Sequence, residues 1–388
     1  GSRVPPPLCW SFCSLLLALA SAACRSMAPL DEVQAGGGVK DLGTLDGGPL
    51  LLFGGAYSNL QALQAMLAVA RDELHIPAER IIHTGDVVAY CAEPRETSEL
   101  LRDSGVHCLM GNCEESIGVG KTDCGCGFPE DSKCNAYSVN WYAHVTRELA
   151  DHQHLCKWMG GLPRRIEFTY SGRRFAVVHG SPRHIAEFVF ASAPEAELNA
   201  SLDALPEEID GVICGHSGIP FARLVSASSG GSSGSSRGRS RLWLNAGVIG
   251  MPANDGTSRA WYAVITPAAG ARGLEVAVKA LSYDAKGAAD AIYARPALVR
   301  GYADSLLSGV WPSHDVLPLQ EQMETSVPLV ERSLLWPTDA DVEEKRATRT
   351  AAASGAQAMA VVGAVALVAT IVAAAAFSWR GRSTRRAT

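Results

Sequence analysis

Short apolar runs alternate with polar, glycine-containing turns through residues 48–318. Residues 49–53 form a continuous apolar run, which is typical of a strand buried on both faces. Apolar residues at helical spacing follow from Leu60 to Ala70, and Ser58 is the expected N-cap of that helix. Further strands are expected at residues 80–83, 106–110, 175–178 and 211–214. This order of strands and helices predicts an α/β fold.

Each of these four later strands ends in a glycine beside one polar residue. Ligands gather at the carboxyl ends of strands in open α/β sheets, so we expect the four polar side chains to share one site. One carboxylate, one amide and two imidazoles suit a divalent metal ion such as manganese, iron or zinc. The candidate ligands are Asp86, Asn112, His179 and His216. Taken singly, each could instead be a helix cap or an ordinary structural residue.

Two other segments differ from this core pattern. Residues 226–240 are rich in glycine and serine and separate two strand-like runs, 220–225 and 242–245. They are expected to form a flexible insertion in a long hairpin. Residues 330–357 are charged and alanine-rich, which predicts a stalk.

The two ends of the chain predict targeting and membrane segments. Residues 359–379 carry no charge and are long enough as a helix to cross a hydrocarbon core of about 30 Å. Arginines follow at once in the basic tail 380–388, so we expect a single-pass membrane protein with a C-terminal transmembrane helix. Residues 1–26 resemble a signal or transit peptide, although Met27 is an alternative start. With a signal peptide the protein is type I, and without one it is tail-anchored.

Composition and charge exclude two classes of protein. Hydrophobic residues make up 47% of the 388-residue chain and charged residues 19%, which excludes disorder over the full length. The 34 Lys and Arg residues are outnumbered by 40 Asp and Glu residues, giving a net charge of −6. A basic nucleic-acid-binding protein is therefore not expected.

The turns after the strands resemble the motifs of one superfamily. Residues 84–90 (TGDVVAY), 111–114 (GNCE), 177–182 (VVHGSP) and 215–221 (GHSGIPF) are similar to GDxVGYG, GN(H/C)(D/E), VHGSP and GHTHxPF. Over residues 48–285, the chain resembles the bacterial-type small phosphoesterases of the calcineurin-like metallophosphoesterase superfamily. The resemblance implies an α/β fold of the α+β sandwich type, with two mixed β-sheets flanked by helices in four layers. It also implies a two-metal site at the strand ends.

Three positions depart from the pattern of that superfamily. Gly55 and Tyr57 replace the Asp and His of its opening motif, and Gly218 replaces the second His of its last motif. The resemblance assigns these three positions to the first metal ion and assigns Asp86, Asn112, His179 and His216 to the second. The expected cofactor is therefore one divalent metal ion, which would activate water for attack on a phosphate ester.

The resemblance also implies catalytic residues. Asp86, Asn112 and His179 carry over residue by residue, but Cys113 stands where many relatives have a His that donates a proton to the leaving group. Either the Cys113 thiol or the Glu114 carboxyl group could donate that proton instead. Cys113 could also be a small buried side chain without a chemical role.

Three further residues are candidate phosphate contacts. Arg183 and His184 follow the His179 turn, and Tyr57 could point its hydroxyl group at a phosphate oxygen. Solvation at the surface is the alternative for Arg183 and His184, and filling of the first-metal position by the ring is the alternative for Tyr57.

Five cysteines gather near the Asn112 motif in the sequence and form a candidate metal or disulfide cluster: Cys91, Cys113, Cys124, Cys126 and Cys134. Their spacing differs from that of the usual structural zinc sites, so disulfides, bound metal and free thiols all stay open.

Three functions follow from these observations. The leading hypothesis is a membrane-anchored, divergent metal-dependent phosphoesterase whose partner is a phosphorylated small molecule or a phosphoprotein. The second is an inactive pseudoenzyme that binds a phosphate ligand or a protein. The third is a thiol-rich metal or redox sensor built on the same scaffold.

Overall fold

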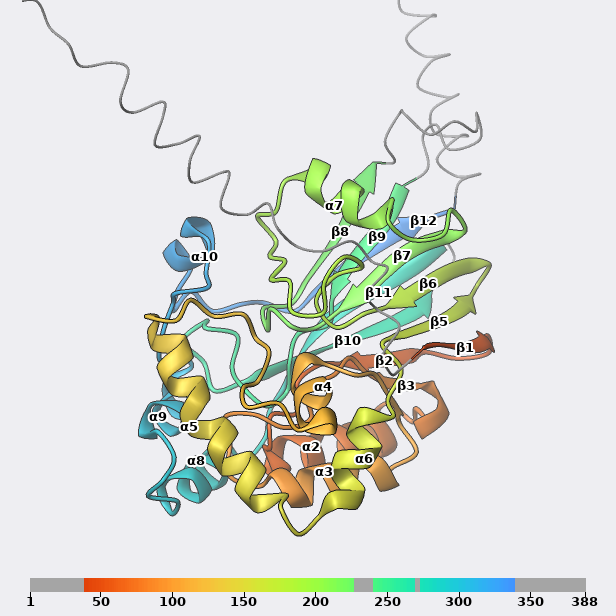
Figure 1. Ribbon diagram of the computed structural model, residues 1–388. Helices are drawn as coiled ribbons and strands as arrows, with labels where there is room; N and C mark the ends of the chain where they lie inside the picture. Colours follow the sequence, from red (N-terminus) through yellow and green to blue (C-terminus); the bar gives the residue numbers. More distant parts are fainter. Residues whose placement is uncertain (1–37, 227–239, 269–272, 339–388) are drawn as a thin grey trace, which may run out of the picture. The chain divides into compact units, whose positions relative to one another are not determined.

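The computed structural model describes residues 38–226, 240–268 and 273–338 (Figure 1). The chain divides into two compact units. The larger unit contains the described residues up to 267 together with 275–334, and it holds the candidate site. Of the described residues, the smaller unit contains 268, 273–274 and 335–338. Within that smaller unit, the amide of Ala268 donates a hydrogen bond to the carbonyl oxygen of Gly273.

Two six-stranded sheets form the framework. The first has the strand order β1 (Val39–Thr44), β5 (Arg165–Tyr170), β6 (Arg173–Val177), β7 (Ile209–Cys214), β9 (Ser240–Asn245), β8 (Phe221–Ser226). The second has the order β12 (Arg332–Pro337), β11 (Gly273–Leu281), β10 (Ala260–Pro267), β2 (Leu50–Phe53), β3 (Ile81–His83), β4 (His107–Cys108). Both sheets contain parallel and antiparallel pairs, so the predicted pair of mixed sheets is confirmed.

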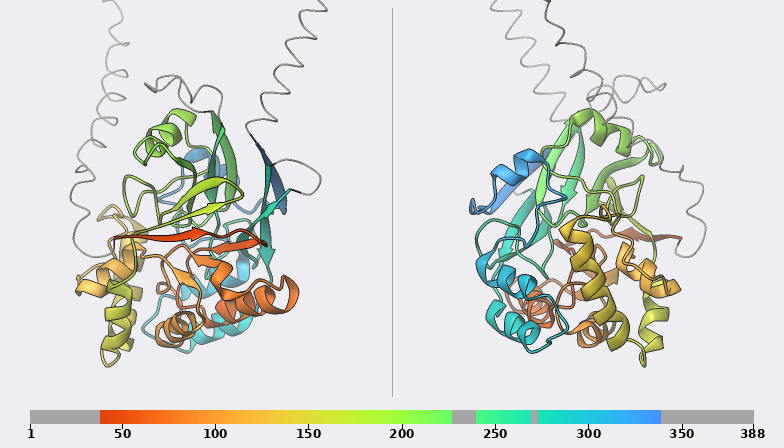
Figure 2. Two further views of the ribbon diagram at one scale, coloured as in Figure 1. Left: turned by 90° about the vertical axis from the view of Figure 1, so that its right-hand side faces the viewer. Right: turned by 60° about the vertical axis from the view of Figure 1, so that its left-hand side comes forward.

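Helices flank both sheets, as predicted (Figures 1 and 2). Helix α7 (Glu195–Leu202) packs against the first sheet, where its leucines join a buried cluster with Val212 and Trp243. The helices that share a second cluster with β2 and β3 include α2 (Leu60–Ala68), α3 (Pro94–Asp103), α4 (Asn112–Val119), α5 (Lys133–Glu148), α6 (Gln153–Gly160), α8 (Ala285–Tyr293) and α9 (Arg300–Ser308). The remaining helical segments are η2 (Val69–Glu73), η3 (Ala78–Arg80) and α10 (Leu319–Met323).

Strand β2 is buried on both faces, as its apolar run predicts. All four of its residues are fully buried. Leu51 and Phe53 belong to the cluster that contains α2, and side chains alternate along a strand, so Leu50 and Leu52 point to the opposite face. The two sheets are linked where the Tyr170 hydroxyl group of β5 donates to the carbonyl oxygen of Ile265 in β10, at 3.4 Å.

The predicted cap of helix α2 is wrong by one residue. Asn59 is the N-cap, and its Oδ1 accepts a hydrogen bond from the amide of Ala62 at 3.0 Å. Ser58 has a φ of +59° and belongs to the preceding loop, where its hydroxyl oxygen accepts from the amide of Ala89. The polar side chain nearest the first helical turn therefore takes the capping position.

Strands extend the sheets beyond residues 48–318. Strand β1 pairs in parallel with β5, and β12 occupies residues 332–337, which were expected to begin a stalk. The predicted hairpin is confirmed, because β8 and β9 are antiparallel and pair from Phe221 with Asn245 to Ser226 with Ser240. Residues 227–239 of the Gly/Ser insertion and residues 339–357 of the expected stalk lie outside the described residues.

The prediction of a transmembrane helix, and with it a single-pass membrane location, is corrected by the structure. Among the described residues, no helix is long and apolar enough to span a bilayer. The 16 residues of α5 extend about 24 Å at 1.5 Å per residue, which is short of a hydrocarbon core of about 30 Å. The segments 359–379, 380–388 and 1–26, on which the predicted topology depended, lie outside the described residues.

Candidate metal centre

The four predicted metal ligands come together at the carboxyl ends of strands from both sheets. Asp86 follows β3 and Asn112 follows β4 in the second sheet. His179 follows β6 and His216 follows β7 in the first sheet. Each side chain is buried, with at most 7% of any of these residues exposed. The site therefore lies where the strand ends of the two sheets meet.

The donor atoms converge on the Nε2 atom of His179. This nitrogen lies 3.1 Å from Oδ2 of Asp86, 3.1 Å from Oδ1 of Asn112 and 2.9 Å from Nδ1 of His216. The distance from Nδ1 of His216 to Oδ2 of Asp86 is 4.0 Å. Two oxygens and two nitrogens thus form one compact group.

Neighbouring groups determine which atoms face this group. Nδ1 of His179 lies 2.7 Å from the carbonyl oxygen of Thr84, so Nδ1 must carry the hydrogen and Nε2 of the neutral ring has a free lone pair. The side-chain amide of Asn112 donates to the carbonyl oxygen of Cys124 at 2.9 Å, which turns the Asn112 oxygen toward His179. A divalent cation fits this set, because it can satisfy all four atoms at once, whereas one proton can bridge only two.

The protonation states of Asp86 and His216 at neutral pH also fit a metal ion. Burial by itself would raise the pKa of Asp86, but the neighbouring His179 and His216 lower it to about 2. Burial, together with the proximity of His179, lowers the pKa of His216 to about 3. Burial by itself would lower the pKa of His179 as well, but the charge and hydrogen bond of Asp86 raise it, so His179 must release a proton to bind a metal ion. A charged carboxylate and a neutral imidazole are the forms that bind metal ions.

Glu114 holds the loop that carries Asp86. Its carboxylate accepts hydrogen bonds from the backbone amides of Asp86 (2.7 Å), Val87 (2.7 Å) and Gly111 (2.8 Å). Asp86 has a φ of +64°, which is unfavourable for a residue with a side chain, so this loop needs such support. Burial, and then the charge of Asp86, raise the pKa of Glu114 to about 7.

Aromatic groups lie at the positions that depart from the superfamily pattern. The Tyr57 ring covers Gly55 so closely that a Cβ atom at residue 55 would lie 2.4 Å from Cζ of Tyr57. No larger residue fits at position 55 while Tyr57 keeps this place. Gly218 has a φ of +75°, and a Cβ atom there would lie 3.2 Å from the Trp311 ring.

The structure brings together three of the five clustered cysteines. Sγ of Cys124 lies 2.7 Å from Sγ of Cys126, and the Asn112 side-chain amide lies 3.2 Å from the same Cys126 sulfur. Cys113 is buried beside them, and burial raises the pKa of its thiol. All eight cysteines in the described part of the chain are free.

Cys91 and Cys134 lie apart from that group. Cys91 donates from its thiol to the carbonyl oxygen of Gly250, and the backbone amide of Cys134 donates to the Asp315 carboxylate. The described residues contain two groups of three or more metal-binding side chains, and neither includes a cysteine: Asp86, His179, His216 and Glu99, His152, His154.

The candidate phosphate contacts Arg183 and His184 have local partners. The Arg183 guanidinium forms an ion pair with Glu187, and the backbone amides of Arg183 and His184 donate to the Ser181 hydroxyl oxygen. Nδ1 of His184 accepts from the amide of Ala186. Their side chains are therefore engaged within their own loop.

Aromatic residues next to the ligands were not identified from the sequence. The Phe188 ring packs on the His216 ring with centroids 4.4 Å apart, and Phe128 stacks on Phe188 at 6.0 Å. Trp311 approaches Gly218 from a distant part of the chain. These residues belong to loops and carry no local motif, so only the tertiary structure reveals them.

Comparisons with known proteins identify similar sequences. A sequence profile of the calcineurin-like phosphoesterase superfamily domain matches residues 58–268, which is more than half of the chain. An uncharacterized protein of Methanocaldococcus jannaschii is 27% identical over 244 residues, covering 61% of this chain and 88% of the relative.

Solved structures are similar as well. A hypothetical protein from Pyrococcus horikoshii OT3 gives a TM-score of 0.53 at 16% identity and covers 69% of this chain and 100% of its own. This likeness concerns the fold. A metallophosphoesterase from Sphaerobacter thermophilus gives a TM-score of 0.49 at 23% identity, covering 68% of this chain and 99% of its own.

Proposed function

Because the chain belongs to the calcineurin-like phosphoesterase superfamily, we propose that it hydrolyses phosphate esters with one divalent metal ion at Asp86, Asn112, His179 and His216. Membership of this superfamily supports a metal-dependent phosphoesterase in general. We further propose that only one of the two metal sites of the superfamily is retained. The observation that carries it is the convergence of Asp86, Asn112 and His216 on the lone pair of His179.

The residues at the first-metal positions support a single-metal site. Gly55 and Gly218 have no side chain that could bind a metal ion, and the Tyr57 ring lies over Gly55. Burial raises the pKa of Tyr57 well above its usual value, and the charge of Asp86 adds to this effect, so the hydroxyl group stays neutral. A neutral phenol is a poor ligand for a divalent ion compared with the Asp and His of the superfamily pattern.

The residues around the site have distinct roles in this proposal. A metal ion held there would lower the pKa of a bound water and polarise a phosphoryl oxygen. The Thr84 carbonyl orients His179, and the Cys124 carbonyl orients Asn112. Glu114 is a positioning residue that holds the Asp86 backbone through its amide hydrogen bonds. Loss of such support commonly weakens metal affinity about 10–100-fold.

Metal content provides the first test. We expect inductively coupled plasma mass spectrometry of the full chain to find one divalent metal ion per chain and to find none in His179→Ala. The matched control is His75→Asn, which removes an exposed imidazole at a φ of +53° that Asn tolerates. Two metal ions per chain, or metal retained in His179→Ala, would refute the single-site proposal.

Phosphate release provides the second test. We expect the manganese, iron or zinc form to release inorganic phosphate from a phosphate monoester such as phenyl phosphate, and Asp86→Asn to abolish this release. A chain that binds one metal ion but releases no phosphate with any of the three metals would contradict the enzyme and favour the alternative of a pseudoenzyme that binds phosphate ligands.

A further inference from the structure

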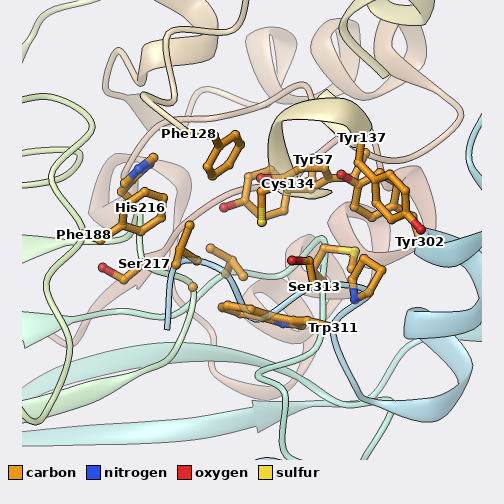
Figure 3. A pocket seen from close by; sticks show the side chains of 16 residues that line it. Tyr57, Phe128, Cys134, Tyr137, Phe188, His216, Ser217, Tyr302, Trp311 and Ser313 are labelled. Carbon is orange, nitrogen blue, oxygen red and sulfur yellow. The ribbon is translucent and has the colours of Figure 1, made fainter. Parts of the chain in front are cut away.

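A small cavity lies beside the candidate metal centre. Its volume is about 80 Å³. His216 lines it and is also a candidate metal ligand, so the cavity and the metal centre share a wall (Figure 3). The other side chains around it come from distant parts of the chain, including Tyr57, Phe128, Phe188, Tyr302 and Trp311.

The cavity lies beside the residues that replace the first-metal ligands. Tyr57 and Gly218 both line it, and Tyr57 covers Gly55. The Trp311 ring reaches Gly218, and its indole nitrogen is held by a hydrogen bond to the carbonyl oxygen of Pro252 at 2.7 Å. Where the superfamily pattern has metal-binding side chains, this chain therefore has a space lined by aromatic rings.

The walls of the cavity are suited to a flat apolar group. Phe128 and Phe188 stack at 6.0 Å, and Phe188 packs on His216 at 4.4 Å. On another side, Tyr90 packs against Tyr57 at 4.7 Å and against Tyr302 at 4.8 Å between ring centroids. Among the described residues that line the cavity there is no Asp, Glu, Lys or Arg. Aromatic rings favour this kind of surrounding, whereas a sugar or a second charged group does not.

We propose that the cavity binds the aromatic ring of the substrate, so that the preferred substrate is a phosphate ester of a single-ring aryl alcohol. The proposal rests on the proposed function for the position of the phosphate, which would lie at the metal centre on the other side of His216. The volume limits the ring, because an engineered protein cavity of about 150 Å³ holds benzene. A space of about 80 Å³ is smaller than that, so it accommodates at most one ring and is too small for a purine.

The chemistry of such an ester suits a site with fewer catalytic groups. In its hydrolysis, the water oxygen bonds to phosphorus and the bond from phosphorus to the aryl oxygen breaks. One proton of the water ends on the aryl oxygen, and the other stays on the new phosphate oxygen. A phenol has a pKa of about 10, so an aryl oxide leaves with little help from a proton donor. This matches the difference that the resemblance implies, in which Cys113 takes the place of a proton-donating His.

The test measures binding without turnover, through protection of a cysteine in the cavity wall. Cys134 lines the cavity and is half-buried, and Cys156 in α6 is half-buried outside it. The full chain with Mn²⁺ is treated with a thiol reagent, and labelling of each cysteine is followed by peptide mass spectrometry. Phenylphosphonate and methylphosphonate are compared, because they share the anion and differ in the ring. We expect phenylphosphonate to protect Cys134 at a concentration at least about tenfold lower, with Cys156 unaffected.

Two matched variants test whether the preference for phenylphosphonate arises in the cavity. Ser313 lines the cavity, and its hydroxyl oxygen accepts from the amide of Asp315, two residues later. Ser308 makes the same kind of bond to Val310 but is exposed outside the cavity. Ser313→Phe should fill the cavity and abolish the preference for phenylphosphonate, whereas Ser308→Phe should retain it. Equal protection by the two phosphonates in the unaltered chain, or a preference that survives in a folded Ser313→Phe, would overturn the proposal.

Two further ligands test the size of the ring and whether it belongs to a protein or to a free molecule. Adenosine monophosphate should protect no better than methylphosphonate, and better protection by it than by phenylphosphonate would refute the single-ring limit. Protection by a phosphotyrosine peptide as well as by phenylphosphonate would support protein-borne aryl phosphates, and protection by phenylphosphonate alone would support free ones. A chain that shows the ring preference but releases no phosphate would support binding of the ring in the cavity, but it would overturn the proposed function and with it the assignment of a substrate.

Discussion

At the residue scale, the Tyr57 ring excludes a side chain at residue 55. Gly55 lies directly under the Tyr57 ring, and a Cβ atom at residue 55 would approach Cζ of Tyr57 to 2.4 Å. The two departures from the superfamily pattern are thus coupled in space, because the ring that replaces one ligand requires the absence of a side chain at the other. Gly55 does not have a positive φ, so its backbone would accept alanine if the ring were absent.

A double-mutant cycle measures this coupling. We expect Gly55→Ala to lower the free energy of unfolding by about 1–3 kcal/mol, because it overpacks a buried site. In the Tyr57→Ala background, the same change should have an effect of less than about 1 kcal/mol. Denaturant unfolding of the four proteins provides the measurement. Equal effects in the two backgrounds would show that the Tyr57 ring does not exclude a side chain at residue 55.

Glu114 supports a second prediction at this scale. Its carboxylate accepts from three backbone amides, and Gln would turn an NH₂ group toward at least one of these donors. Glu114→Gln should therefore lower the free energy of unfolding by about 1–3 kcal/mol and weaken metal binding. Chemical denaturation and metal titration test the two effects. Glu96→Gln, which alters a partly exposed ion pair with Arg95, should change stability by at most about 0.5 kcal/mol, and an equal loss in both variants would contradict the prediction.

At the scale of elements, the pairing of the β8–β9 hairpin does not depend on the long insertion between its strands. Its strands pair from Phe221 with Asn245 to Ser226 with Ser240. This register is formed by the strands themselves and by the parallel pairing of β9 with β7. Closure of the hairpin therefore depends on joining Ser226 to Ser240, and a short turn can do this.

Replacement of residues 227–239 by Asn-Gly tests whether a short turn can close the hairpin. We expect the free energy of unfolding to rise by about 1–2 kcal/mol, because a shorter loop loses less entropy on closure. Thermal unfolding and metal content are the measurements, and metal content should stay unchanged. A scrambled Gly/Ser segment of the original length is the control and should match the parent chain. A loss of stability on shortening would mean that the insertion makes stabilising contacts of its own.

At the scale of the whole molecule, the candidate metal centre is built from residues of both sheets. Asp86 and Asn112 follow strands of one sheet, and His179 and His216 follow strands of the other. An ion bound by all four side chains would bind the folded chain and not the unfolded one, in which the ligands are far apart in the sequence. Metal binding should therefore stabilise the packing of both sheets.

Thermal unfolding with and without the metal tests this expectation. A free Mn²⁺ concentration of 100 times the dissociation constant should add about 2.7 kcal/mol, which corresponds to a rise of about 5–10 °C in Tm. The rise should disappear in His179→Ala and persist in His75→Asn. An equal rise in both variants would place the stabilising ion elsewhere, such as at Glu99, His152 and His154.

The sequence alone determined several of the buried strands and the polar residues at their ends, but it did not indicate β5, β10 or β11. Continuous apolar runs such as 50–53 indicate strands without any tertiary information, because only burial on both faces favours them. Strand β1 was not predicted because it is polar and largely exposed. Strand β12 was not predicted because it lies in a segment that is rich in charged residues. The cap of α2 was misplaced because Ser58 and Asn59 are both good capping residues, and only the backbone conformation separates them.

Tertiary structure alone decided what surrounds the candidate metal ligands. The sequence indicated Asp86, Asn112, His179 and His216 because each stands beside a glycine at a strand end. It gave no sign that Tyr57 covers Gly55, that Glu114 binds the Asp86 loop, or that Phe188 and Trp311 enclose a cavity. The physical reason is that a strand is specified by local burial and alternation, whereas a cavity is formed by side chains far apart in the sequence, whose proximity only packing determines.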